Sequence, residues 1–496
     1  MATSRVVVVG AGLAGLAAAC HLRGAGHDVV VVEADDGPGG RAGSLATGGY
    51  RFDTGPTVLT MPHLVDECFA ALGASRADYV ELRRLDPMYR ACYADGSEIR
   101  VRHGREEMAA EIRDVCGARE AESFVRFCDW LTRLYDLEMP RFIERNYDGA
   151  TDLVRPPRPA LQLARLGGLR KLAPAVAHYF DDERLRRLFS FQAMYAGLAP
   201  VDALAIYAVI TYMDVVNGVF LPTGGMHALP QGLASALADA GVELRYGERV
   251  ERIVTAGRGG AVRGVRLADD TLLAADAVVC TVDLPVAYRS LLPAVPAPRV
   301  VRRGTYSPSA LVWHLGVDGP LPLGVEHHNI HVGHEWDRSF HEILREGRRM
   351  TDPSVLVTVP TVSEPSMAPP GRHVLYVLEP VPNLDAPIDW TREREVARDR
   401  LAEIVGRLGY PTEPDVEMLV DPTDWDAQGM ERGTPFALSH RFFQSGPFRP
   451  TNVDRRVPGL VFAGSGTQPG VGIPMVLVSG RLAAERVGAP SGRGIR

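Results

Sequence analysis

A glycine-rich segment near the start of the chain constrains the fold more than any other feature. Four successive valines, Val6–Val9, predict a buried strand, and Gly-Ala-Gly-Leu-Ala-Gly at Gly10–Gly15 follows directly and opens a helical pattern. In a Rossmann-type unit such a loop brings the pyrophosphate of a dinucleotide to a helix N-terminus. A second strand, Asp28–Val32, ends at Glu33, where an acidic side chain is expected to bind the adenosine ribose. The order of these elements predicts an α/β fold with a dinucleotide site.

The three glycines of this loop have different expected tasks. Gly10 permits a tight turn, Gly12 lets the backbone approach phosphate, and Gly15 lets the helix pack closely on the strand. We therefore expect the whole loop to form part of the cofactor site. Its predicted residues are Gly10, Ala11, Gly12, Leu13, Ala14 and Gly15.

The C-terminal part of the chain repeats this arrangement. Strand Leu460–Ala463 leads into the glycine-rich segment Gly464–Pro474, within which helix Ile473–Val487 begins. A helix N-terminus at this point would favour the negative charge that a flavin gains on reduction. Taken together, the two loops predict that both ends of the chain hold one FAD.

Composition sets wider limits on what the protein does. With 496 residues and 46% apolar content, the chain can bury a large core and is expected to form two or three intertwined domains. A net charge of -7 gives no general attraction to nucleic acid. Six cysteines without CxxC or zinc spacing are typical of reduced thiols in a cytosolic protein. The first strand begins within a few residues of Met1, so no signal peptide is expected and a cytoplasmic location follows.

The domains are expected to be interleaved. Residues 1–60, 216–290 and 441–496 would form the FAD-binding domain, 61–215 a helical membrane-facing lid, and 291–440 a substrate-binding domain with a mixed sheet. Helices are expected over Glu106–Leu134, Asp182–Met194 and Met226–Ala240. Strands are expected over Val242–Tyr246, Val250–Thr255, Ala261–Leu267, Leu272–Cys280, Ala310–Val317 and Val374–Val381, and the tail Gly488–Arg496 is expected to fray.

One segment suggests contact with a membrane. The longest apolar runs are too short or too broken by glycine to span a bilayer. In Arg155–Leu172, however, five cations alternate with five leucines, which suits a surface lying at a bilayer interface. An ordinary amphipathic surface helix explains the pattern equally well. Three prolines and the Gly167-Gly168 pair exclude one long helix. The expected location is therefore cytoplasmic, peripheral to the inner face of the cell membrane.

Further motifs resemble one enzyme family along nearly the whole chain. The sequence is similar to the bacterial phytoene desaturases, which are FAD-dependent carotenoid oxidoreductases. That resemblance implies a Rossmann-like FAD-binding domain of amine-oxidase-like flavoprotein architecture. It rests on both glycine loops and on Gly39–Arg41, Asp53–Pro56, Phe189–Gln192, Ala205–Ile210, Leu221–Met226, His327–Ile330, Val381–Leu384, Phe443–Ser445 and Arg449–Asn452.

The resemblance implies further cofactor residues. Gly40 and Arg41 would meet the ribityl and pyrophosphate region, and the backbone of Val250 would meet adenine. Two positions depart from the family pattern: Gln468 stands where histidine is common, and Met475 where glycine often follows the Ile-Pro pair. The larger Met475 side chain could narrow the tunnel beside the flavin. The remaining residues expected at the cofactor are Gly55, Gly464, Gly472 and Ile473.

The implied reaction is desaturation of phytoene or a related polyene hydrocarbon in carotenoid biosynthesis. Such a substrate has no ionisable group, so apolar burial must hold it in a long pocket. A flavin would take a hydride, and the cation left behind would lose a proton. No single residue stands out as the proton acceptor, and the electron acceptor can be quinone, oxygen or NAD. Three alternatives stay open, namely a carotene isomerase, a saturase and a non-enzymatic isoprenoid carrier, whereas a flavin amine oxidase fits the C-terminal loop less well.

Four closely spaced histidines invite a metal-site hypothesis. His327, His328, His331 and His334 offer imidazole ligands, but a strand would send His327 and His331 to one face and the other two to the opposite face. No cysteine lies nearby. A structural role is therefore favoured, and no metal ligands are predicted.

Overall fold

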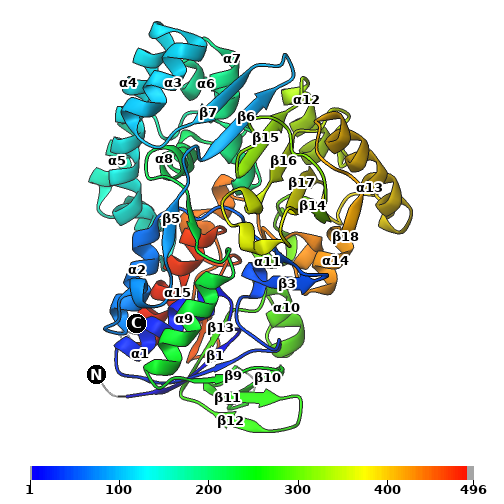
Figure 1. Cartoon of the computed structure of the whole chain (residues 1–496). Helices are drawn as coiled ribbons and strands as arrows, with labels where there is room; N and C mark the ends of the chain where they lie inside the picture. The colour runs from blue at the N-terminus through cyan, green and yellow to red at the C-terminus, as the bar shows by residue number, and fades with distance from the viewer. Residues whose placement is uncertain (1–2, 258, 489–496) are drawn as a thin grey trace.

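The N-terminal valine strand lies at the centre of a five-stranded parallel sheet in the computed structural model, which describes residues 3–257 and 259–488. The strand order is β19-β13-β1-β2-β9, and all neighbouring pairs are parallel. Figure 1 shows this sheet close to both termini. Distant parts of the sequence thus build one sheet, from β1 (Arg5–Val9), β2 (Asp28–Val32), β9 (Glu243–Arg245), β13 (Ala277–Cys280) and β19 (Leu460–Phe462).

The alternation of side chains in β1 explains how both faces of this sheet are covered. Val6 and Val8 belong to the core that helices share with one face, while Val7 and Val9 belong to a second core on the other face. The covering helices are α1 (Leu13–Gly24), α9 (Ala228–Asp239) and α15 (Ile473–Gly488). The opposite face carries an antiparallel sheet of β10 (Val250–Thr255), β11 (Val262–Leu267) and β12 (Leu272–Ala274).

A seven-stranded mixed sheet forms the second part of the fold. Its order is β18-β14-β17-β16-β15-β6-β7, antiparallel except where β15 pairs with β6. Helix α13 (Trp390–Arg407) packs its apolar side on one face, against a core that includes Trp313 and Leu315 of β14. The strands are β6 (Tyr89–Tyr93), β7 (Glu98–Val101), β14 (Ser309–Val317), β15 (His328–Val332), β16 (Val355–Thr358), β17 (His373–Val381) and β18 (Pro414–Val420).

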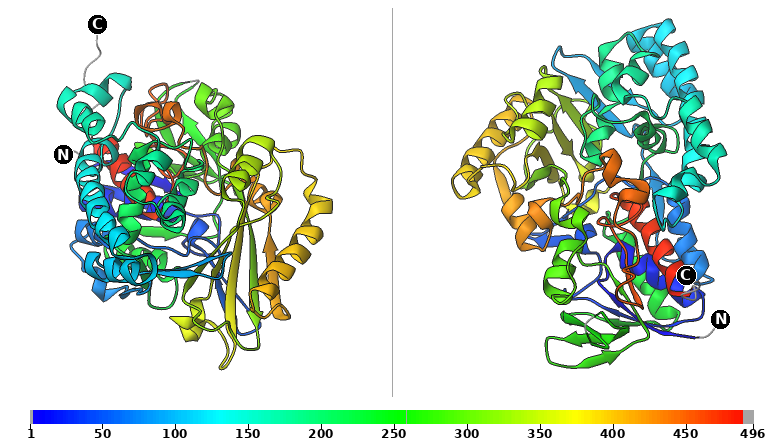
Figure 2. Two further views of the ribbon diagram at one scale, coloured as in Figure 1. Left: turned by 90° about the horizontal axis from the view of Figure 1, so that it is seen from above. Right: turned by 180° about the vertical axis from the view of Figure 1, so that it is seen from behind.

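A group of helices faces this sheet from the other side of the molecule. In Figures 1 and 2, α3, α4 and α5 lie opposite α13, and α1 and α15 run side by side below them. The group comprises α3 (Arg105–Cys116), α4 (Ala118–Glu138), α5 (Pro157–Arg165), α6 (Leu172–Ala177), α7 (Glu183–Leu188) and α8 (Ala208–Val215). The remaining elements are α2 (Pro62–Ala71), α10 (Leu284–Val286), α11 (Arg299–Arg303), α12 (Trp336–His341), α14 (Pro422–Ala427), β3 (Ser44–Thr47), β4 (Tyr50–Asp53), β5 (Leu82–Arg84) and β8 (Phe220–Pro222).

The structure differs from the expected elements at three places. The strand expected over Leu272–Cys280 is divided, because β12 joins the antiparallel sheet and β13 the parallel sheet. The helical run Glu106–Leu134 is broken at Gly117, whose φ of 96° ends α3. The run Asp182–Met194 is helical first as α7 and then as a 3₁₀ turn over Phe191–Ala196.

The expected domain limits stay predictions, although two observations bear on them. Strands β6 and β7 lie within the segment expected to form a helical lid, yet they pair at one edge of the seven-stranded sheet. Gly488 ends α15, and the rest of the tail that was expected to fray lies outside the described residues.

Candidate functional site

A cavity of about 1270 Å³ extends from the two glycine loops to the seven-stranded sheet and the helices. Gly10 and Gly464 line it where the two loops meet, Val312 and Tyr376 line it on the sheet, and Leu163 lines it on α5. One continuous space therefore contains both the predicted cofactor loops and a long apolar region. Such a space can hold a dinucleotide and a hydrophobic ligand next to each other.

Most of the predicted cofactor residues lie on the wall of this cavity. They come from the loop after β1 and the start of α1, from the segments that follow β2 and β4, from the Gly39–Arg41 turn, and from the C-terminal loop and the start of α15. The fold thus brings together positions near opposite ends of the sequence. Those on the wall are Gly10, Gly12, Leu13, Ala14, Glu33, Gly40, Arg41, Gly55, Gly464, Gly472, Ile473 and Met475. Ala11, Gly15 and Val250 do not line it.

Close contacts explain three of the glycines. A Cβ at Gly10, where φ is 104°, would lie 2.3 Å from Oγ1 of Thr281. A Cβ at Gly15 would lie 2.0 Å from the carbonyl oxygen of Gly10, and one at Gly55 would lie 1.8 Å from that of Arg41. The lack of a side chain at Gly15 therefore lets α1 pack closely against the end of β1, at a position that does not line the cavity. This close packing is what the loop pattern predicts.

Ala11 and Glu33 form a fixed unit at the dinucleotide end. The amide of Ala11 donates to Oε2 of Glu33 at 2.6 Å, and the amide of Asp35 donates to Oε1 at 3.0 Å. These bonds set the position of a buried carboxylate at the edge of the cavity. Val250 is buried in β10 and pairs with Leu267, while its neighbour Arg249 reaches the cavity, so the predicted adenine contact through Val250 stays a prediction.

Arg41 links the Gly39–Arg41 turn to the C-terminal glycine loop. Its Nη1 donates to Oγ of Ser465 at 3.2 Å, while its buried Nε has no hydrogen-bond partner in the protein. Gly12 caps α1 without any side-chain hydrogen bond, so the first amides of the helix also lack side-chain acceptors. A bound anion would satisfy both sets of donors. These residues therefore fit the pyrophosphate of FAD.

Behind the C-terminal loop lies a buried arginine that the sequence analysis did not assign a role. The guanidinium of Arg449 donates to the carbonyls of Thr467 at 2.9 Å and Leu438 at 3.1 Å, and also to those of Ser465 and Gln444. Burial lowers the pKa of Arg449 to about 10. The side chain thus joins the C-terminal loop to the preceding segment through the backbone alone.

The apolar part of the cavity contains two buried acidic side chains. Asp214 of α8 accepts a hydrogen bond from the hydroxyl of Tyr89 at 3.3 Å, and burial raises the pKa of Asp214 to about 7. Glu138, the last residue of α4, is 4% exposed, and burial raises its pKa well above the usual value. Sequence reasoning missed both residues as parts of the site.

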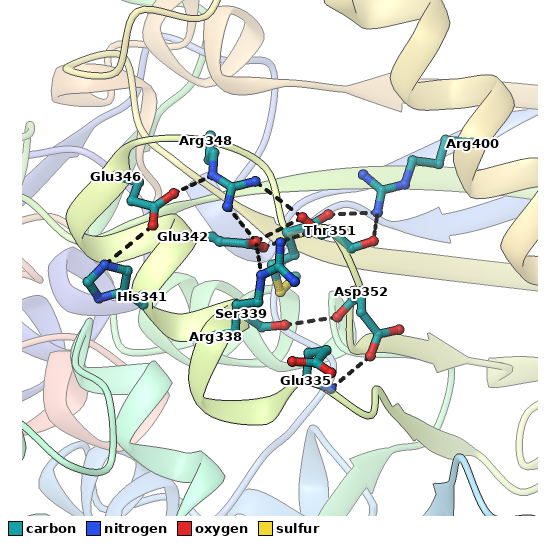
Figure 3. A network of polar contacts seen from close by, with 11 residues as sticks. Glu335, Arg338, Ser339, His341, Glu342, Glu346, Arg348, Thr351, Asp352 and Arg400 are labelled. Atoms are coloured by element: carbon teal, nitrogen blue, oxygen red, sulfur yellow. Dashed lines mark hydrogen bonds and ion pairs between the residues drawn. The ribbon is translucent and has the colours of Figure 1, made fainter.

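An ion-pair network supports one wall of the cavity, formed by Phe340, Ile343 and Met350. Figure 3 shows its centre at the buried Glu342, which accepts from Nε of Arg338 at 2.9 Å and pairs with Arg348 at 2.7 Å. The amide and hydroxyl of Thr351 donate to the same carboxylate at 2.6 and 2.8 Å. Although burial acts to raise it, these hydrogen bonds and charges hold the pKa of Glu342 below its usual value of 4.5.

Low pH should lower the stability of the protein, because it protonates Glu342 in this wall. A carboxylate whose pKa is lowered in the folded protein contributes stability above its unfolded value of 4.5, and that stability is lost as the pH falls through the lower folded value. Glu342→Gln is expected to cost about 1–3 kcal/mol at pH 7 and to reduce the fall in melting temperature between pH 7 and pH 3.5. Thermal melts check this against Glu395→Gln, which changes an exposed carboxylate on α13. An equal fall for wild type and Glu342→Gln would contradict it.

The histidine cluster makes protein contacts instead of gathering around one point. The ring nitrogens of His328 lie 3.1 Å from the carbonyl of Met88 and 3.0 Å from that of Thr57. Nε2 of His331 lies 3.1 Å from the hydroxyl of Tyr410. Within residues 3–257 and 259–488, no three His, Cys, Asp or Glu side chains are placed to hold a metal ion. These contacts agree with the structural role favoured by the sequence.

The paired glycine loops, the unsatisfied donors beside them and the adjoining apolar space define a flavin-dependent oxidoreductase. The chain belongs to the flavin containing amine oxidoreductase family, whose sequence pattern matches residues 13–488. Within that family it is 51% identical to a phytoene dehydrogenase of Streptomyces griseus, over 98% of this chain and 95% of the relative. It is 38% identical to a zeta-carotene-forming phytoene desaturase of Myxococcus xanthus, over 97% of this chain and 93% of the relative.

Solved structures agree on the fold. An oxidoreductase from Methanosarcina mazei has a TM-score of 0.63 and 18% identity, with 97% of this chain and 100% of that chain covered. A putrescine oxidase bound to putrescine has a TM-score of 0.58 and 19% identity, with 98% and 99% covered. The expected α/β architecture with a Rossmann-like parallel sheet is therefore confirmed, and so is FAD as the cofactor of the family.

Proposed function

We propose that the protein is an FAD-dependent desaturase that introduces double bonds into phytoene or a related polyene in carotenoid biosynthesis. The observation that carries this proposal is the continuity of the cavity, which places a long apolar space directly against the FAD-binding loops. Relatives named as phytoene dehydrogenase and phytoene desaturase align over almost the full length of the chain, which supports the same substrate class.

Apolar contact supplies the binding energy for such a substrate. Phe191, Ile210, Ile330 and Leu378 line the cavity from four different elements and can enclose a hydrocarbon chain. Each buried Å² of apolar surface contributes about 25 cal/mol. Bound FAD supplies the two-electron acceptor. The protein's own contribution is to exclude water and to hold one pair of substrate carbons beside the C-terminal loop.

Anaerobic mixing tests the proposed function directly. FAD-loaded protein is mixed with phytoene in detergent or liposomes, the flavin absorbance is followed, and the products are identified by chromatography. Loss of the oxidised-flavin band together with a more unsaturated polyene is expected. A carotene isomerase would form an isomer of equal mass with no net loss of that band, and an isoprenoid carrier would release the substrate unchanged. Either of these outcomes would contradict desaturation.

We also propose that the helical region around α5 forms a membrane-facing lid. Leu161 and Leu169 are each 52% exposed in the segment where the sequence alternates cations with leucines. Leu163 and Leu172 of the same segment are buried, so only part of the pattern faces outward. Val154 and Leu169 are exposed and also line the cavity. An apolar ligand would therefore enter the cavity beside this surface.

An aromatic cluster extends the proposed membrane surface. Phe443 is 73% exposed and stacks edge-on against Phe442 and Phe448, both of which line the cavity. The turn that carries Phe448 contacts the turn Ala150–Val154 that precedes α5. Among the described residues, no helix combines the length and apolar character needed to cross a bilayer. Binding from one side is thus the mode we propose, at the inner face of the cell membrane.

Charge placed on this surface should abolish membrane binding. Leu161→Glu combined with Leu169→Glu is expected to lower the fraction bound to anionic vesicles at least about tenfold, because two apolar contacts are lost and two repelling charges are added. Cosedimentation measures this fraction. Leu272→Glu is the matched control, since Leu272 is 49% exposed on β12 in the nucleotide-binding part. Equal losses for both variants would contradict the assignment of the surface.

The proposed membrane surface also bears on which molecule reoxidises the reduced flavin. A membrane-bound enzyme has ready access to quinone, while oxygen and NAD reach it from solution. Stopped-flow reoxidation of the reduced enzyme by quinone in vesicles, by oxygen and by NAD separates the three. We propose quinone, because the apolar surface and the cavity mouth coincide. Reoxidation by quinone that is slower than by oxygen or NAD would contradict it.

A further inference from the structure

Glu138 is an acidic residue in an unusual position. The buried side of α4 follows the spacing Phe124, Phe127, Leu131 and Leu134, and Glu138 continues this apolar stripe at the end of the helix. Its side chain lines the cavity, and its buried Oε1 has no hydrogen-bond partner among the described residues. A buried carboxyl group without a partner is costly, and groups of this kind gather at functional sites.

The other carboxylates on the wall of the cavity are held by partners or open to solvent. Glu33 accepts hydrogen bonds from two backbone amides, and Asp283 accepts hydrogen bonds from the amides of Leu284 and Glu431. Asp214 accepts a hydrogen bond from the hydroxyl of Tyr89, and Asp35 is exposed to solvent. Glu138 therefore differs from them in that its carboxyl group is buried and not engaged by the protein.

Glu138 lines the cavity together with Tyr147 and Tyr207. Burial raises the pKa of Tyr147 and of Tyr207 to about 12 each, and the charge of Glu138 adds to the rise in both. The amide of Tyr147 donates to Oε1 of Gln468 in the C-terminal loop at 3.3 Å. The hydroxyl of Tyr207 contacts Oγ of Ser445 at 2.8 Å. Glu138 thus shares the cavity wall with two tyrosines that contact the C-terminal part of the chain, including Gln468 of the flavin loop.

We propose that Glu138 is a catalytic residue that takes the proton which the polyene releases during desaturation. The inference rests on the proposed function. In the complete step, two C–H bonds on neighbouring carbons break and one carbon–carbon double bond forms. One hydrogen leaves with its electron pair to FAD, and the other leaves as a proton to a carboxylate oxygen of Glu138. The substrate is oxidised by two electrons and FAD is reduced by two.

The surroundings of Glu138 suit this task. Away from water and without hydrogen-bond donors, a carboxylate is a stronger base than in solution. Because burial favours the protonated form of Glu138, the base is the fraction that has ionised before hydride transfer, and flavin reduction should become faster as the pH rises. Net transfer of the hydride requires this proton loss, because a cation that keeps its proton takes the hydride back. Removal of the base should therefore slow reduction of the flavin itself.

Glu138→Gln in the FAD-loaded enzyme tests the proposal, since glutamine keeps the shape and removes the base. Anaerobic flavin reduction by phytoene is expected to slow at least about 100-fold, with FAD content and substrate binding unchanged. Glu120→Gln is the matched control, because Glu120 is a buried glutamate on the same helix with an unpartnered Oε2, yet lies outside the cavity. It is expected to react at the wild-type rate within about threefold.

An isotope effect separates a catalytic from a structural role. Phytoene deuterated at the carbon that loses the proton should give a larger isotope effect on flavin reduction with Glu138→Gln than with wild type. A slow variant whose isotope effect is unchanged, or a variant as fast as wild type, overturns the proposal. If Glu138→Gln loses FAD, Glu138→Leu takes its place, since leucine is of similar size and has no base, and a wild-type rate there overturns the proposal equally. A wild-type enzyme that phytoene fails to reduce overturns the proposed function itself.

Discussion

Gly15→Ala is expected to leave the protein essentially without bound FAD. The new Cβ would lie 2.0 Å from the carbonyl oxygen of Gly10, a backbone atom at the turn of the dinucleotide loop. Relief of this contact must move α1 away from β1 and carry the first amides of the helix away from the pyrophosphate. We expect FAD affinity to fall at least about 100-fold, as measured by the flavin-to-protein ratio and by titration of the apoprotein.

Two features make this result easy to interpret. Gly15 lies inside α1, where alanine is intrinsically more favourable than glycine by roughly 1 kcal/mol, so helix propensity cannot cause the loss. Gly37→Ala is the control, because a Cβ at Gly37 meets no atom within 4 Å. If Gly15→Ala retained stoichiometric FAD at wild-type affinity, the close approach of helix and strand would not be needed for the site.

Arg449→Lys should destabilise the protein strongly although it is a conservative change. The guanidinium donates hydrogen bonds to four carbonyl oxygens, including those of Ser465 and Thr467 in the C-terminal loop. An ammonium group has no planar fork and cannot reach all four, so buried acceptors lose their partners. Loss of about 3 kcal/mol or more is expected, because each unsatisfied buried group costs about 1–3 kcal/mol. FAD release should accompany it.

Thermal melts with and without added FAD measure the effect of Arg449→Lys. Arg455→Lys is the control, since Arg455 is 72% exposed and pairs with Asp148 at 3.3 Å on the surface. That change is expected to stay within about 0.5 kcal/mol of wild type. A comparable melting temperature for the two variants would mean that the C-terminal loop keeps its shape without the buried arginine.

The cofactor end of the site could be predicted from the sequence because its signals are local. Each loop consists of a strand, a few glycines and a helix start in direct succession, and backbone sterics dictate the glycines. Gly10, Gly15 and Gly55 all make contacts that exclude a side chain. The same reasoning predicted the bounds of α9, β10 and α15 to within a few residues, since each has a regular spacing of apolar residues and distinct ends.

Long-range pairings could not be predicted in this way. Nothing in β6 indicates that it pairs in parallel with β15, which lies far along the chain, and nothing near Arg449 shows that its partners are carbonyls. The apolar stretch of β12 and β13 gave no sign that the chain changes sheets between Ala274 and Ala277. Pairings of this kind depend on the whole fold and not on the local pattern.

Glu138 shows a signal that was present in the sequence but not used. Counting along α4 from Phe127 in steps of four, three and four residues leads to Leu131, Leu134 and Glu138. The helical period therefore places this glutamate on the buried side, where an acidic residue has no structural reason to lie. Acidic residues on the apolar face of α4 include both Glu138 and Glu120. The structure distinguishes them, because Glu138 lines the cavity whereas Glu120 lies outside it and accepts a hydrogen bond from the amide of Asp181.

The parallel sheet also sets the order of events during synthesis. Strand β1 needs β13 as a neighbour, and β13 needs β19, which ends at Phe462 in the last part of the chain. Because a growing chain leaves the ribosome from its first residues onward, β19 emerges after β1, β2, β9 and β13. The nucleotide pocket of the nascent protein therefore stays unfinished until β19 and the glycine loop after it have emerged.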